Sequence, residues 1–179
     1  MRWQDISRDL AAVLQGDALL AAQRPIIVVD SAQQCLHRLD IDAANNRSYP
    51  VSTAANGIGN RVDSYMTPHG IHRIEQKIGG DEPRGMVFEA RKPTGRVASN
   101  LDNRDQDEIT SRILWLGGLE PGINRDGDCD TRSRYIYIHG TSDERRIGQP
   151  VSAGCIRMNN ADVIELFEEV EVGDLVIIR

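Results

Sequence analysis

Cysteine is scarce in this sequence of 179 residues, and its three copies form neither a CxxC pair nor an even-numbered set. Structural zinc sites and disulfide-stapled scaffolds depend on such spacings, so both are disfavoured. A single disulfide between Cys35 and Cys129 stays open at this stage. The sequence gives no reason to expect a metal or any other cofactor.

Long apolar runs are also missing, because no stretch reaches the roughly 18 residues that a membrane-spanning helix needs. Residues 1–23 have the pattern of an amphipathic helix broken by charged side chains, which is unlike a secretory signal. The sequence as given therefore predicts a soluble, cytoplasmic protein without a membrane span. If a leader has been trimmed from it, we expect the periplasm or the cell envelope instead.

The sequence also has few clusters of positive charge. Acidic residues (27) outnumber basic ones (21), the formal net charge is −6, and no basic cluster extends beyond the short Arg145-Arg146 pair. Surfaces that bind nucleic acid follow the phosphates with clustered lysine and arginine. Nucleic acid is therefore not an expected partner, and the sequence carries no signal for an oligomeric state.

The composition, with 40% hydrophobic and 27% charged residues, is that of an ordinary globular protein. The length suits one domain, and neither internal repeats nor low-complexity linkers divide it. We expect an N-terminal helical segment at residues 1–24 and one domain at residues 25–179. The first helix is predicted from a single apolar face formed by Trp3, Ile6, Leu10, Val13 and Leu14.

Short β-branched or alternating runs between turn formers predict a mostly β domain. A helix is predicted to follow Asn159 or Asn160, because apolar residues recur at i, i+3, i+4 and i+7 from Val163 to Val170. The polar stretch 93–108 is expected to be a surface loop. The expected strands cover residues 26–29, 34–39, 49–52, 70–78, 86–88, 113–116, 135–138 and 175–178.

Two segments carry residues suited to nucleophilic chemistry. One is a predicted strand that ends at His139-Gly140, and the other is the tight turn Ser152-Ala153-Gly154-Cys155, whose cysteine follows His139 by sixteen residues. A free thiol has a pKa near about 8.5, and a neighbouring imidazole can take its proton. Cys155 is thus the candidate nucleophile, and His139 is the candidate base.

Glycine has a physical role beside each of these residues. Gly154 lets a substrate approach closely and lets the backbone N–H groups of Gly154 and Cys155 converge, as an oxyanion hole requires. Gly140 allows a similar approach next to the histidine. Either its carbonyl or that of His139 is expected to orient the imidazole.

The segments I-H-G-T and V-S-A-G-C-I-R-M-N-N resemble the catalytic core of the L,D-transpeptidase (YkuD-type) family. Upstream, Y-P-V-S-T-A-A-N-G-I-G-N-R and T-P-H-G-I-H-R-I are similar to the same family, as are the opening I-I-V-V-D and the closing G-D-L-V-I-I. The resemblance covers about residues 26 to 179. It implies a β-sandwich-like L,D-transpeptidase catalytic domain at residues 25–179 that acts on peptidoglycan stem peptides or muropeptides.

By this resemblance Cys155 attacks the bond between the L-centre of meso-diaminopimelate, or of a similar diamino acid, and terminal D-alanine. The resulting thioester passes to an amine and makes a 3→3 cross-link. Many members have histidine where this chain has Ala153. For Tyr137, core packing and cleft lining stay equally open. Supporting or substrate-binding positions are Ser152, Ala153, Arg157, Tyr137 and, in the T-P-x-G segment that lines the cleft, Pro68 and Gly70.

Other interpretations remain at this stage. Water in place of the amine would make the protein an L,D-carboxypeptidase of muropeptide recycling, and an inactive peptidoglycan-binding module is a third possibility. A papain-like protease is disfavoured, since there the cysteine precedes the histidine. His69 and His72 would point to opposite faces of a strand, which makes a shared metal awkward.

Overall fold

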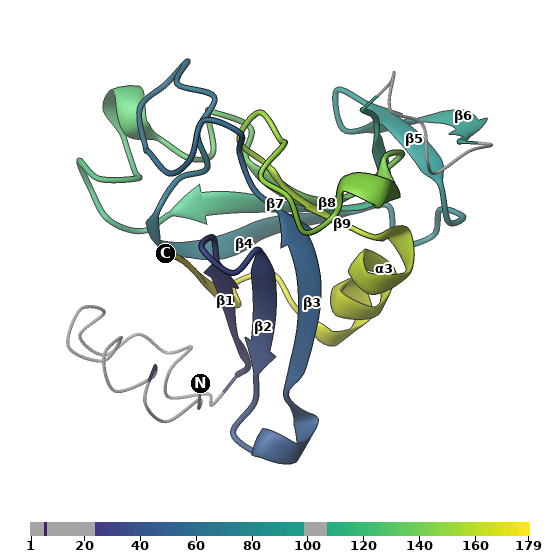
Figure 1. Ribbon diagram of the computed structural model, residues 1–179, viewed down its shortest axis with the longest axis horizontal. Coiled ribbons are helices and arrows are strands. Elements are labelled where there is room, and N and C mark those ends of the chain that lie inside the picture. Colours follow the sequence, from purple (N-terminus) through teal and green to yellow (C-terminus); the bar gives the residue numbers. More distant parts are fainter. Residues whose placement is uncertain (1–5, 7–23, 99–106) are drawn as a thin grey trace.

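The computed structural model describes residues 6, 24–98 and 107–179, and this part of the chain is mostly β-structure (Figure 1). The fold class expected from the sequence is therefore confirmed. The helix expected over residues 1–24 lies outside the described residues except for Ile6 and Arg24. Among the described helices, none is long and apolar enough to cross a bilayer.

The strands are joined by short turns and three 3₁₀ helices, and α3 follows β9 near the end of the chain. The 3₁₀ helices are Ala43–Asn45, Gly127–Cys129 and Glu144–Arg146, and α3 is Asn160–Glu169. The strands are β1 (Ile26–Asp30), β2 (Cys35–Leu39), β3 (Arg47–Ser52), β4 (Gly70–Ile78), β5 (Met86–Glu89), β6 (Lys92–Val97), β7 (Ile109–Gly118), β8 (Tyr137–Thr141), β9 (Ile156–Met158) and β10 (Leu175–Ile178).

The sheet closes on itself. Its strands follow the order β4-β10-β1-β2-β3-β9-β8-β7-β5-β6, and a further antiparallel pairing joins β4 to β7. Figure 1 shows β1, β2 and β3 side by side, while β7, β8 and β9 run across behind them and the β5–β6 hairpin extends from the body. The result is a sandwich-like body with two layers of strands.

The main core lies between these two layers. Val29 and Val51 reach it from β1 and β3, and Leu114 and Ile138 reach it from β7 and β8. Helix α3 covers one side of the core with Val163, Leu166 and Phe167. Burial of apolar surface at about 25 cal/mol per Å² is the main favourable term that holds such layers together.

Most of the predicted strands are confirmed, and the runs at 70–78 and 175–178 match β4 and β10 residue for residue. The predicted helix is confirmed as α3, with Asn159 at its N-cap position. β1 and β2, which match the first two predicted strands, pair in antiparallel fashion and form a hairpin.

Two predictions of local structure are wrong. The stretch 93–108 is not a single loop, because β6 occupies Lys92–Val97 and pairs with β5 through a two-residue turn at Ala90 and Arg91. All six residues of β6 are exposed, so the strand has no apolar alternation to reveal it. The strand predicted at 135–138 is β8, which begins at Tyr137 and continues through His139-Gly140 to Thr141 instead of ending before them.

A buried amide ties α3 to the strands that carry the candidate site. The side-chain oxygen of Asn160 accepts hydrogen bonds from the hydroxyls of Thr110 (2.6 Å) and Ser111, both on β7. Its side-chain nitrogen donates to the Thr141 carbonyl on β8 (2.8 Å) and to the Glu144 carboxylate (2.8 Å). Asn160 is fully buried, and polar groups in such a position are normally hydrogen-bonded.

We predict that Asn160→Ala lowers the free energy of unfolding by about 2 kcal/mol or more, because it leaves several buried polar groups without partners. The matched control is Asn159→Ala. Asn159 makes no capping hydrogen bond with its side chain, and its amide donates to the nearby Asp162 carboxylate, so the expected loss is about 0.5 kcal/mol. Urea unfolding of both variants checks this, and equal losses would contradict the role given to Asn160.

Candidate active site

The candidate site is built on the parallel pairing of β8 with β9. Ile138 lies opposite Ile156 and His139 lies opposite Arg157. Side chains alternate along a strand, so the two isoleucines enter the main core while His139 and Arg157 point to the other face. Cys155 directly precedes β9 on that same face, and its Sγ accepts a hydrogen bond from the Tyr137 N–H at 3.4 Å.

Several of the predicted residues line one pocket of about 190 Å³. These are His139, Cys155, Arg157, Ser152 and Ala153, joined by Asp107 and Ile109, which the sequence analysis did not single out. The pocket thus brings together the candidate nucleophile, the candidate base and the turn between them.

Other predicted residues lie elsewhere. Pro68 and Gly70 are not among the residues that line this pocket, and Gly70 pairs with Ile178 at the start of β4. The Tyr137 ring is buried in an apolar cluster, and its hydroxyl accepts a hydrogen bond from Arg91 (3.1 Å). Core packing therefore accounts for the Tyr137 side chain, while its backbone N–H contacts the sulfur of Cys155.

The tautomer of His139 follows from one hydrogen bond. Its Nδ1 lies 2.7 Å from the Gly140 carbonyl oxygen, which only accepts, so Nδ1 carries the proton. Nε2 is then the nitrogen that can take a proton from a thiol. Burial lowers the pKa of His139, outweighing the Gly140 hydrogen bond and the Asp107 charge, so the imidazole is neutral near pH 7.

Gly140 is required by close packing. A Cβ at this position would lie 2.6 Å from the Thr110 carbonyl oxygen and 2.7 Å from the side-chain oxygen of Asn160. Both distances are below normal contact, and both Thr110 and Asn160 take part through their side chains in the buried network described above. The glycine beside His139 therefore keeps β8 in place against β7 and α3.

The thiol of Cys155 is held in its neutral form. Burial raises its pKa, and this effect exceeds the opposite influence of the Tyr137 N–H and of the Arg157 and Arg134 guanidinium groups. The Sγ also lies 3.5 Å from the Tyr135 carbonyl oxygen, to which a protonated thiol donates. The resting pair is thus a thiol and a neutral imidazole, so proton transfer from sulfur to nitrogen has to accompany attack on a substrate and does not precede it.

The turn before Cys155 is fixed by hydroxyl groups. Ser152 Oγ donates to the Cys155 carbonyl (2.6 Å) and accepts from the Gly154 N–H (3.2 Å). Thr67 Oγ1 donates to the Gly154 carbonyl (2.9 Å). Gly154 has φ +130°, and a Cβ there would meet the Ile136 side chain at 3.1 Å, so the turn favours glycine. The oxyanion hole remains a prediction, and the Gly154 N–H would have to leave Ser152 to serve it.

Asp107 is a residue that the sequence analysis missed. It forms an ion pair with the buried guanidinium of Arg157, and its other oxygen accepts a hydrogen bond from the Thr141 hydroxyl (3.1 Å). It was overlooked because it belongs to the polar stretch expected to be a surface loop. The available signal was Arg157 itself, since a buried arginine next to a nucleophile needs a carboxylate partner.

Metal-binding alternatives receive no support within the described ranges, where no group of three or more potential ligands is found. His72 is buried and its ring nitrogens contact the Gly70 carbonyl and the Thr131 hydroxyl, each at 3.1 Å. All three cysteines are free, so the disulfide that had been left open is not formed.

Comparison with known proteins identifies the family. Residues 24–178 match the family model of the L,D-transpeptidase catalytic domain, YkuD, so this chain belongs to that family. The membership and the mostly β fold agree with the resemblance found in the sequence.

Curated relatives carry the same family name. YqjB of Bacillus subtilis (strain 168), assigned to the L,D-transpeptidases by its name, is 48% identical over 63 residues, which cover 35% of this chain and 34% of YqjB. A Fuscovulum blasticum protein with the same assignment, from the ATP synthase subunits region, is 25% identical over 156 residues, 84% of this chain and 67% of the relative. The match to YqjB thus spans about a third of either protein.

Solved structures agree in fold. An L,D-transpeptidase from Mycobacterium smegmatis superposes with a TM-score of 0.55 at 16% identity, covering 87% of this chain and 58% of the other. L,D-transpeptidase 3 from Mycobacterium tuberculosis, solved with a faropenem-derived adduct, gives a TM-score of 0.53 at 17% identity and covers 87% of this chain and 60% of the other. At such identity the likeness concerns the fold alone.

We predict that Cys155 reacts slowly with iodoacetamide at pH 7 and that its rate rises about tenfold per pH unit up to pH 9, without a plateau. The sign follows from the raised pKa of the thiol, which lowers the thiolate fraction at any given pH. Mass spectrometry of a Cys35→Ser, Cys129→Ser protein measures this one thiol. A plateau at or below pH 7 would instead indicate a stored thiolate–imidazolium pair.

Proposed function

We propose that this chain is a cysteine-dependent L,D-transpeptidase that acts on peptidoglycan tetrapeptide stems through a thioester on Cys155. The observation that carries the proposal is that Cys155 and His139 line one pocket, with the Gly140 carbonyl fixing the imidazole tautomer. Family membership supports the same reaction class. The substrate follows from the resemblance of the motif segments to the family's catalytic core.

In the first half-reaction the Cys155 sulfur attacks the carbonyl carbon of the diamino acid's L-centre while its proton moves to Nε2 of His139. Negative charge then develops on the carbonyl oxygen, where the backbone N–H groups of Gly154 and Cys155 would stabilise it. The carbon–nitrogen bond breaks, and the departing amine of D-alanine takes the proton from His139. A thioester and free D-alanine result.

In the second half-reaction an amine of another stem peptide attacks the thioester carbon and gives its proton to His139. The carbon–sulfur bond breaks, the sulfur regains a proton from the imidazole, and a 3→3 cross-link forms. His139 thus acts as base and then as acid in each half, and a neutral resting imidazole suits that cycle. With water as acceptor, the same site would act as an L,D-carboxypeptidase.

Mass spectrometry with a disaccharide-tetrapeptide tests the proposal. We predict that the wild-type protein gains the mass of the tripeptide acyl group and releases D-alanine, and that Cys155→Ala does neither. His139→Gln should acylate at least about 10²-fold more slowly, because the general base is lost. A cross-linked dimer or an exchanged D-amino acid identifies the transpeptidase, whereas a free tripeptide identifies the carboxypeptidase.

The matched control is Cys35→Ala. Cys35 lies on β2 with its Sγ 3.9 Å from Nδ1 of His37, so it also has a histidine neighbour, but it lies outside the candidate pocket. This variant should acylate at the wild-type rate. If the wild-type and Cys155→Ala proteins bind the peptide equally and both remain unmodified, the inactive binding module is correct and the enzyme is excluded.

A further inference from the structure

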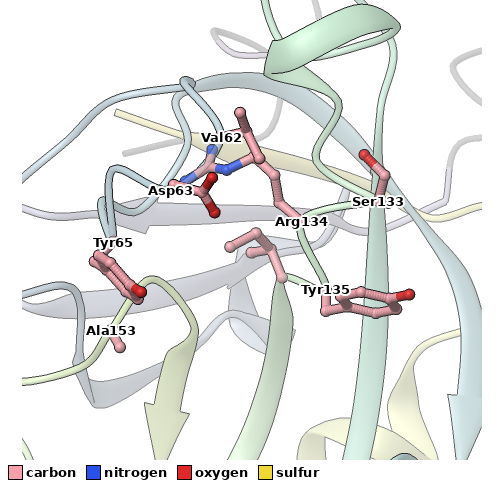
Figure 2. A pocket seen from close by; sticks show the side chains of 8 residues that line it. Val62, Asp63, Tyr65, Ser133, Arg134, Tyr135 and Ala153 are labelled. Atoms are coloured by element: carbon pink, nitrogen blue, oxygen red, sulfur yellow. The ribbon is translucent and has the colours of Figure 1, made fainter.

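A second pocket, of about 270 Å³, lies beside the candidate active site. It is formed by the segments 62–65 and 133–136 and by Ala153, which also lines the pocket of Cys155. Figure 2 shows Tyr65 and Ala153 on one side of it and Tyr135 on the other. The Tyr135 carbonyl contacts the Cys155 sulfur, so this pocket adjoins the nucleophile.

Arg134 brings a positive charge into this pocket. Its guanidinium is half-buried and donates to the carbonyls of Met66 (2.6 Å) and Gly59 (3.2 Å), and more weakly to the Ser64 hydroxyl (3.4 Å). Within the described part of the chain it forms no ion pair. Half-buried charges are normally paired, so this arginine is available for an anionic ligand.

Arg134 is also electrostatically linked to the reacting group. Burial lowers the pKa of its guanidinium, and a thiolate at Cys155 would be the main charge to oppose this effect. In return, Arg134 is one of the groups that lower the pKa of the Cys155 thiol. An anion bound at Arg134 would therefore lie close to the substrate group that Cys155 attacks.

Asp63 lines the same pocket with an exposed carboxylate. Among the described residues it has no ion-pair partner, and it does not pair with Arg134. Two opposite charges that share a pocket without neutralising each other suit a ligand that carries both a carboxylate and an ammonium group.

The backbone around the pocket is strained in a way that favours a ligand-binding role. Asp63, Tyr65 and Tyr135 all have positive φ (57°, 54° and 56°), a conformation that is rare for side chains as bulky as tyrosine. The two tyrosines are 62% and 52% exposed, although large aromatic side chains are usually buried. Strain of this kind gathers at functional sites, where it is offset by the surrounding structure.

We propose that this pocket binds the free α-amino acid end of the acyl donor's diamino acid, with Arg134 on its carboxylate and Asp63 on its ammonium group. The inference rests on the proposed function and specifies its donor. In a tetrapeptide stem the terminal D-alanine also has a carboxylate, but its nitrogen belongs to the amide that is cleaved. The side-chain end of the diamino acid carries both charges on one carbon.

Calorimetry on the inert Cys155→Ala protein tests this independently of catalysis. Three tetrapeptides are compared: unmodified, amidated at the side-chain carboxylate of the diamino acid, and amidated at the terminal carboxylate. We predict that side-chain amidation weakens binding by about tenfold or more. When Arg134→Gln is added, side-chain amidation should no longer weaken binding, and when Arg134→Lys is added it should weaken binding less than in the parent. The effect of terminal amidation should be the same in all three proteins.

Arg134 also holds the 59–66 loop, so a purely structural role predicts that Arg134→Gln weakens the binding of all three peptides equally. The proposal is overturned if side-chain amidation weakens binding to the Arg134→Gln variant as much as to the parent. It is also overturned if that variant loses the effect of terminal amidation instead, or if the unmodified peptide shows no measurable binding to the parent. Addition of Arg61→Gln, an exposed position of the same loop, is the control and should leave the effect of side-chain amidation intact.

Asp63→Asn supplies the complementary measurement in the same Cys155→Ala protein. Acetylation of the diamino acid's side-chain amine should weaken binding of the tetrapeptide to the parent protein, and should weaken its binding to the Asp63→Asn variant less. If acetylation lowers the affinity of both proteins equally, Asp63 does not bind the ammonium group. If the wild-type protein is not acylated but these binding differences are observed, the proposed enzymatic function is wrong and the proposed binding site is supported. If the wild-type protein is acylated but the binding differences are not observed, the proposed binding site is wrong and the proposed enzymatic function is supported.

Discussion

The register of the parallel pair β8–β9 determines where the groups of the candidate site lie. Ile138 is opposite Ile156, so one face of the pair enters the core and the other carries His139 and Arg157. A shift of one residue would turn these side chains into the core and expose the isoleucines. Because burial of the isoleucines fixes the register, core packing also fixes the position of Cys155 beside the backbone of Tyr137.

The same burial sets the chemistry of the two groups. It raises the pKa of the Cys155 thiol and lowers that of the His139 imidazole, so both are neutral at rest. Asp107 and Arg157 bring opposite charges into the lining of the pocket and pair with each other. Under the proposed mechanism such a site stores no thiolate, and the proton moves from sulfur to nitrogen only while a bound substrate is being attacked.

Much of this fold can be predicted from local sequence, because buried strands such as β4 and β10 and the amphipathic helix α3 carry their own periodicity. The Cys155 motif and His139 are likewise visible as short segments. Strand β6 was missed because all of its side chains are exposed, so its pairing with β5 leaves no apolar pattern. Closure of the sheet by β4 and β7, and the ion pair of Asp107 with Arg157, join residues far apart in sequence and are set only by tertiary packing.

Ala153 lies between the pocket of the candidate nucleophile and the pocket proposed to select the donor. Its small, exposed side chain lines both the pocket of Cys155 and the pocket of Arg134. Gly154 and Cys155 follow Ala153 in a turn fixed by Ser152. A substrate side chain in the Arg134 pocket would therefore contact the same turn that holds the candidate nucleophile. If the proposed donor fills both pockets, the backbone of this turn relates its position in one pocket to the position of its scissile carbonyl beside the sulfur in the other.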